Sequence, residues 1–192
     1  SHFFILQDLN KFRGIDLRQS IHLTQIPDLS SARNLERINI AYCRSLLQFP
    51  LHILRNLNRH IDVNLSYCDK LQSLPLEGSN LDTFPMNNLS KLSLNNCKRL
   101  ANLPSFMNKL DSLKELNLGG CSILETFPEV PLNIKSLDIH GTAIKEVASS
   151  SIEGRFDLQY INMLNCKSLA SLPSNIFKMR SLIDLNLDGC SN

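Results

Sequence analysis

The sequence predicts an α/β solenoid, in which each coil of the chain contributes one short parallel strand to a common sheet. Three observations in the 192-residue sequence support this fold. One leucine motif recurs along the whole chain, its copies begin 21 to 29 residues apart, and all six cysteines occupy the same position in it. Repetition at a period of this length is typical of proteins whose stacked coils share one continuous core.

The motif is clearest at residues 113–128, LKELNLGGCSILETFP, and its consensus is L-x-x-L-x-L-x-x-C-x-x-L-x-x-L-P. The second and third leucine positions are aliphatic or Met in all copies, whereas the first position holds His60 in the third copy. This is the signature of a leucine-rich repeat. We therefore predict a leucine-rich-repeat horseshoe of about eight coils. The copies begin at residues 12, 35, 60, 89, 113, 134, 158 and 182.

The L-x-L core of each copy predicts a short parallel strand on the concave face. Alternate residues of a strand point to opposite sides, so the leucines should point into the coil and the residues between them outwards. The return segments are expected to be irregular or briefly helical, since 51–59, 105–112 and 174–181 have helical apolar spacing but are too short to be stable helices alone. Prolines should end the turn segments and block a continuing helix: Pro27, Pro50, Pro75, Pro104, Pro128 and Pro173.

Two copies depart from the pattern. The third copy runs for 29 residues, and its segment 76–88 is either an additional rung or a bulged loop. The copy that begins at 134 is short and has Ala148 in place of the proline. Irregular coils of this kind change the local curvature of a solenoid, and insertions can lie on a binding face, but tolerated insertion or deletion is the alternative that loops favour.

The cysteines follow the strand, where the chain turns inward and a side chain must be small. Zinc sites usually bring ligands in close pairs, whereas these cysteines lie at least 24 residues apart. A catalytic thiol needs a nearby base, and no histidine recurs beside the position. Disulfides between neighbouring coils are compatible with the strand spacing, but Ser and Thr substitutes favour a structural ladder of reduced thiols. The ladder residues are Ser20, Cys43, Cys68, Cys97, Cys121, Thr142, Cys166 and Cys190.

Composition argues against several kinds of partner. The net charge is +2, which gives no reason to expect nucleic acid or an anionic membrane as a partner. No apolar run is long enough to span a bilayer, and no phosphate-binding loop G-x-x-x-x-G-K-[ST] occurs, so we expect no membrane insertion and no cofactor.

Both ends look cut, and residues 1–192 are expected to be one leucine-rich-repeat domain from a longer protein.

Two stretches carry a family resemblance: IPDLSSARNLERINIAYCRSLLQFP at 26–50 and LDIHGTAIKEVASSSI at 137–152. They resemble the repeats of plant intracellular immune receptors of the TIR–nucleotide-binding–leucine-rich-repeat class, which carry PDLS.A.NLE.L.L..C.SL early and GTAI.E.PSSI later. The resemblance implies a disease-resistance module in the cytoplasm or nucleus. It would recognise a pathogen effector, a host target or the adjacent nucleotide-binding domain, and would restrain that switch domain. The nucleotide site and the NAD-cleaving TIR domain of such receptors would lie outside this segment.

The predicted function is therefore a non-enzymatic protein-binding module that uses the concave face. An extracellular receptor ectodomain and a generic scaffold are the alternatives, although plant ectodomains carry L-x-G-x-I-P, and these repeats lack that glycine. Tyr42 and Tyr67 share one position on adjacent coils, where they either anchor a partner or stack on each other. The candidate partner-binding residues are Arg18, Arg37, Asn39, Tyr42, Asn64, Tyr67, Asn117, Asp138, His140, Tyr160 and Asn162.

Overall fold

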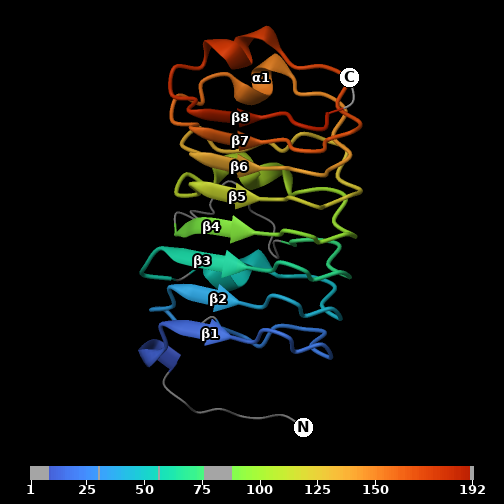
Figure 1. The fold of residues 1–192 in the computed structure, drawn as a ribbon. Helices are drawn as coiled ribbons and strands as arrows, with labels where there is room; N and C mark the ends of the chain where they lie inside the picture. Colours follow the sequence, from blue (N-terminus) through green and yellow to red (C-terminus); the bar gives the residue numbers. More distant parts are fainter. Residues whose placement is uncertain (1–8, 30, 56, 76–87, 191–192) are drawn as a thin grey trace.

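The computed structural model describes residues 9–29, 31–55, 57–75 and 88–190. Coils are stacked along one axis, and all strands lie side by side on one face of the stack (Figure 1). They form a single parallel sheet of eight strands in sequence order, which confirms the predicted leucine-rich-repeat solenoid. The strands are β1 (Gly14–Asp16), β2 (Arg37–Asn39), β3 (Ile61–Asn64), β4 (Leu89–Ser93), β5 (Glu115–Asn117), β6 (Ser136–Asp138), β7 (Tyr160–Asn162) and β8 (Asp184–Asn186).

The third coil differs from its motif by one residue. Ile61, not His60, is fully buried and pairs with Leu89 of β4. The register shifts between Ile61 and Asp62, so a β-bulge absorbs the difference in length. The apparent exception in the first leucine position is thus a displaced isoleucine.

The core runs through the stack behind the sheet. The aliphatic residues of each L-x-L segment point into it, as Leu92, Leu116 and Leu137 do in adjacent strands. Each coil can bury its leucines only against its neighbours, and therefore the core is continuous from one coil to the next.

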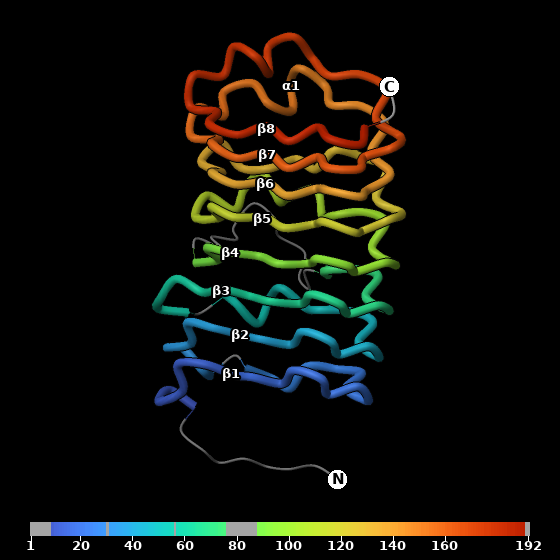
Figure 2. The backbone as a smooth tube through the Cα atoms, in the orientation of Figure 1, coloured from blue at the N-terminus to red at the C-terminus, as the bar shows by residue number. Residues whose placement is uncertain are grey.

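Among the described residues, the return segments include the short helices η2 (Leu51–Leu54), η4 (Ser105–Lys109), α1 (Ser149–Ile152) and η5 (Ser174–Lys178). A further turn, η1 (Leu9–Lys11), precedes β1. Figure 2 shows the described backbone as stacked coils that run from the strand side to the opposite side of the stack and back. The predicted irregularity at 76–88 lies outside the described residues, apart from Asn88.

The sequence predicted that the prolines end a turn and block a continuing helix, whereas three of them lie at the start of a short helix. Pro50, Pro104 and Pro173 directly precede η2, η4 and η5, so they introduce the short helices. Ala148 takes the same place before α1, with φ −67° and ψ 145°. Its carbonyl accepts the Ser151 N–H at 2.9 Å, as the Pro104 carbonyl accepts that of Met107 at 3.1 Å.

Candidate recognition surface

The strand ends are built from one recurring turn. In the fifth coil, Asn117 Oδ1 accepts the backbone N–H of Gly119 at 2.9 Å, and Asp138 Oδ1 accepts that of His140 at 3.1 Å in the sixth. This is an Asx turn, in which the side chain replaces a backbone acceptor. Ser93 is different, since its Oγ lies 2.8 Å from Ser66 Oγ. The same turn occurs at Asp16, Asn39, Asn64, Asn162 and Asn186.

The residue just before each ladder position adopts a left-handed backbone conformation. The φ values run from 57° to 71° in all eight coils. Three coils have glycine there, and in one of them a Cβ added to Gly120 would lie 2.4 Å from Asn96 Oδ1 of the preceding coil. The other five coils place side chains in this costly region. The residues are Gln19, Tyr42, Tyr67, Asn96, Gly120, Gly141, Asn165 and Gly189.

The cysteine ladder connects each coil to the one before it. Cys97 Sγ donates to the Leu65 carbonyl at 3.2 Å, and the thiols of the other five cysteines make the equivalent bond at 3.1–3.2 Å. Thr142 differs, because its Oγ1 donates to Ile139 within its own coil at 2.8 Å. All six cysteines are free thiols, and five are buried.

Burial also determines the chemistry of these thiols. It raises the pKa of Cys68 and of Cys121 to about 12, and it raises the pKa of Cys97 further still. A thiolate is the reactive form of cysteine, so these thiols are poor nucleophiles at neutral pH. Their hydrogen bonds and their protonation both fit a structural position.

A second ladder, which the sequence analysis missed, runs where each coil returns to the sheet. Asn34 Nδ2 donates to the Asn10 carbonyl at 2.8 Å, and Asn133 Nδ2 donates to the Asp111 carbonyl at 3.4 Å. Asn88 and Ser181 make similar bonds to the preceding coil. The available signal was a small polar residue directly before the first leucine position.

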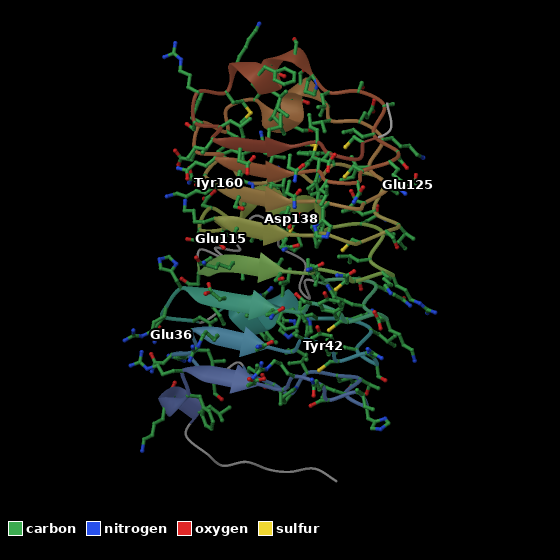
Figure 3. The ribbon with its side chains drawn as sticks, viewed as in Figure 1. Glu36, Tyr42, Glu115, Glu125, Asp138 and Tyr160 are labelled. Atoms are coloured by element: carbon green, nitrogen blue, oxygen red, sulfur yellow. The ribbon has the colours of Figure 1, made fainter. Side chains whose placement is uncertain are left out.

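The strand starts carry exposed charges that pair between coils. Glu36 accepts from Arg13 at 2.6 Å and lies 3.0 Å from Arg59, and Lys91 lies 2.7 Å from Glu115. The Arg13 hydrogen bond holds the pKa of Glu36 below its usual value, and the Glu115 carboxylate raises that of Lys91. In Figure 3, Glu36, Glu115 and Tyr160 lie near the starts of their strands. Asp138 lies at the end of β6, and Tyr42 lies beyond the end of β2.

The predicted residues on β2 and β3 line a shallow depression. Its volume is about 330 Å³, and its floor includes Arg37, Asn39 and Asn64. Asp62, which the sequence analysis omitted, stands between Arg37 and Lys91 in the strand register. Asn117 lies at the far side of the depression, whereas Asp138, Tyr160 and Asn162 lie on β6 and β7.

Tyr42 and Tyr67 stack on each other beyond the strand ends. Their ring centroids are 4.5 Å apart and their planes differ by 3°. The geometry agrees with the stacked alternative and leaves Tyr42 partly exposed. Arg18, one residue before the same position in the first coil, forms an ion pair with Asp16 at 2.9 Å.

His140 is also engaged within the fold. Its Nδ1 lies 2.8 Å from Asp138 Oδ1, and a Cβ on Gly119 would lie 2.1 Å from the imidazole ring. The ring therefore needs a glycine in the preceding coil.

Among the described residues, no group of three or more His, Cys, Asp or Glu side chains could hold a metal ion. None of the helices in the same residues has the length and the apolar character needed to span a bilayer.

No protein-family model matches the chain. It is 33% identical over 180 residues to a probable disease resistance protein of Arabidopsis thaliana, covering 92% of this chain and 10% of that protein. It is 31% identical to Disease resistance protein RPP5 of the same plant, covering 96% of this chain and 17% of the relative. TMV resistance protein N of Nicotiana glutinosa is 30% identical, with coverage of 95% and 14%. The chain thus spans between 10 and 17% of the length of these relatives.

Solved structures show the same fold. The leucine-rich repeat domain of the type III effector XCV3220 (XopL) matches with a TM-score of 0.68 and 22% identity, covering 94% of this chain and 69% of that one. The functional domain of InlJ from Listeria monocytogenes, which includes a cysteine ladder, has a TM-score of 0.50 and 15% identity, with coverage of 85% and 37%. The repeat motif and the sequence relatives indicate the same protein family. The chain is a leucine-rich-repeat segment that belongs to the plant disease-resistance proteins of the TIR–nucleotide-binding–leucine-rich-repeat class.

Proposed function

We propose that this segment is the partner-recognition module of its receptor and that its strand face binds a protein. The observation that carries the proposal is the exposed polar surface at the strand starts of β2 to β5. There Arg37, Asp62, Lys91 and Glu115 alternate in sign from one strand to the next. At about 4.8 Å per strand, the sheet of eight strands is about 34 Å long, which suits a protein interface better than a small ligand.

The partner is a pathogen effector, a host target or the adjacent nucleotide-binding domain. The relatives are named as disease resistance proteins, one of them against TMV, which supports recognition linked to infection. In the resting receptor, contact between this segment and the switch domain would hold that domain inactive. The reduced, buried thiols fit an intracellular receptor, because free thiols persist in reducing compartments.

The module acts by binding rather than by catalysis. The His140–Asp138 pair resembles part of a catalytic set, but the Asp138 carboxylate also accepts the His140 backbone N–H in the strand-end turn. The raised pKa of the Cys68 thiol argues against its use as a nucleophile.

The test uses the full receptor that contains this segment, expressed in leaf tissue. Arg37→Glu and Lys91→Glu reverse two charges on the strand face, and Lys98→Glu makes the same change at an exposed position outside it. We expect both strand-face variants to change the immune cell-death response, through lost response to the pathogen or through response in its absence. The Lys98→Glu variant should behave as wild type. Folded strand-face variants with an unchanged response in both conditions would refute the proposal.

A further inference from the structure

A second candidate surface lies on the return side of the sixth and seventh coils, away from the strand face. A cavity of about 540 Å³ opens between the turn at 153–156 and η5. Its apolar lining comes from Ile152, Phe156 and Met179. We propose that this cavity is a second docking site, which takes an acidic segment of a partner protein that carries an aliphatic or aromatic anchor.

The apolar part of the argument rests on Phe156. Its side chain is 81% exposed, more than any other large apolar side chain in the described ranges. Its backbone is nevertheless fixed, since its carbonyl accepts a hydrogen bond from Ser181 Oγ. The turn thus holds a bare aromatic ring at the mouth of the cavity, and aromatic residues are enriched among interface anchors.

The charges around the cavity identify the occupant. Arg155, Lys178 and Arg180 line it, with Glu153 as the single acid, so the lining carries a surplus of two positive charges. Arg155 is held by the carbonyls of Val130 and Glu153, each at 2.8 Å. Its guanidinium therefore has a fixed position.

Lys178 and Arg180 are exposed, and within the part of the chain that the structure describes neither forms an ion pair. Elsewhere, exposed charges of neighbouring coils pair directly, as Lys145 does with Glu125 at 2.6 Å. The bases at the cavity therefore remain available to carboxylates of a partner. A free phosphate would satisfy these basic side chains but would bring no apolar group for the ring, so an acidic peptide with an apolar anchor is the better match.

The test selects binders to the full 192-residue chain from a phage-displayed library of random dodecapeptides. Binders to the double variant Phe156→Ser/Arg180→Glu are removed first. The surviving peptides should be rich in Asp and Glu around a Leu, Ile or Phe. A selected peptide, labelled with fluorescein, is then titrated against the single variants by fluorescence anisotropy. We expect Phe156→Ser to raise the Kd by about tenfold or more, the equivalent of an anchor losing its apolar contact.

Arg180→Glu should also raise the Kd, most strongly at low salt, because the contact is electrostatic. Ile21→Ser and Lys98→Glu are matched controls at exposed positions in other coils and should leave the Kd unchanged. Three outcomes would overturn the proposal: no acidic consensus, binding that survives both variants, or displacement of the peptide by equimolar inorganic phosphate. Strand-face variants such as Arg37→Glu should not affect this binding, so the outcome is independent of the proposed function.

Discussion

Leu116 and Asn117 of β5 test the assignment of the two faces, because these neighbours differ chiefly in the side toward which they point. Leu116 is 1% exposed and pairs with Leu92 and Leu137 in the adjacent strands. Asn117 points outward, where its Oδ1 accepts the Gly119 N–H at 2.9 Å. We expect Leu116→Asp to unfold the segment and Asn117→Asp to leave it folded.

The magnitudes follow from these environments. Leu116→Asp removes about 1.5–3 kcal/mol of apolar burial and adds several kcal/mol for an unpartnered buried carboxyl group. Since a domain is stable by about 5–15 kcal/mol, this change consumes most of that margin. Asn117→Asp retains the acceptor of the turn. It places a second carboxylate opposite Asp138 of β6, which costs about 0.2–1 kcal/mol.

Urea unfolding followed by far-UV circular dichroism measures both effects, and the chain has no Trp for a fluorescence assay. The Leu116→Asp variant should already be unfolded without urea and should therefore show no cooperative transition. The urea midpoint of Asn117→Asp should lie close to that of the wild type. A third variant, Asn117→Leu, removes the turn acceptor and should cost about 1 kcal/mol. Equal midpoints for the two aspartate variants would refute the strand register and both face assignments.

Three further results are expected. Iodoacetamide should modify Cys68 slowly in the native protein at neutral pH and rapidly in urea, because burial raises its pKa to about 12; rapid native labelling by mass spectrometry would contradict the ladder. Ala148→Pro should raise the urea midpoint by the equivalent of about 0.4–1 kcal/mol, because φ is already −67° and, among the described residues, the Ala148 N–H has no acceptor. Gly120→Ala should destabilise by about 1–2 kcal/mol because φ is +71° and Asn96 Oδ1 would lie 2.4 Å from the new Cβ, whereas the control Gly14→Ala, with nothing nearer than 3.8 Å, should change the midpoint little.

The sheet could be predicted because the aliphatic pattern is strict. Two leucine positions hold aliphatic residues or Met in every copy, and each strand includes the first of these two residues and ends at the residue between them. The bulge at Ile61 could not be predicted in this way. A fixed spacing counted back from Cys68 places His60 in the buried position, and only the pairing with Leu89 shows that the register shifts by one residue.

The surface residues were harder to interpret because an outward position does not reveal what its side chain contacts. Asn39, Asn64 and Asn162 were predicted as partner contacts from their facing alone, but their Oδ1 atoms complete Asx turns. A recurring Asn or Asp two residues before a turn is itself a signal for that bond. The left-handed backbone at Tyr42 and Tyr67 was also hidden, since tyrosine gives no indication of positive φ.

These turns divide the strand face into two parts with different freedom to change. At the strand ends, the Asx acceptor, the left-handed residue and the ladder residue are all used by the fold, so a substitution there costs stability before it alters binding. At the strand starts, Arg37 and Tyr160 complete no such turn, and surface substitutions usually change stability by less than about 0.5 kcal/mol. The proposed recognition module can therefore vary its strand starts while its strand ends stay constant. For this reason, the Arg37 and Lys91 variants test recognition more directly than substitutions at the strand-end residues Asn39, Asn64 and Asn162.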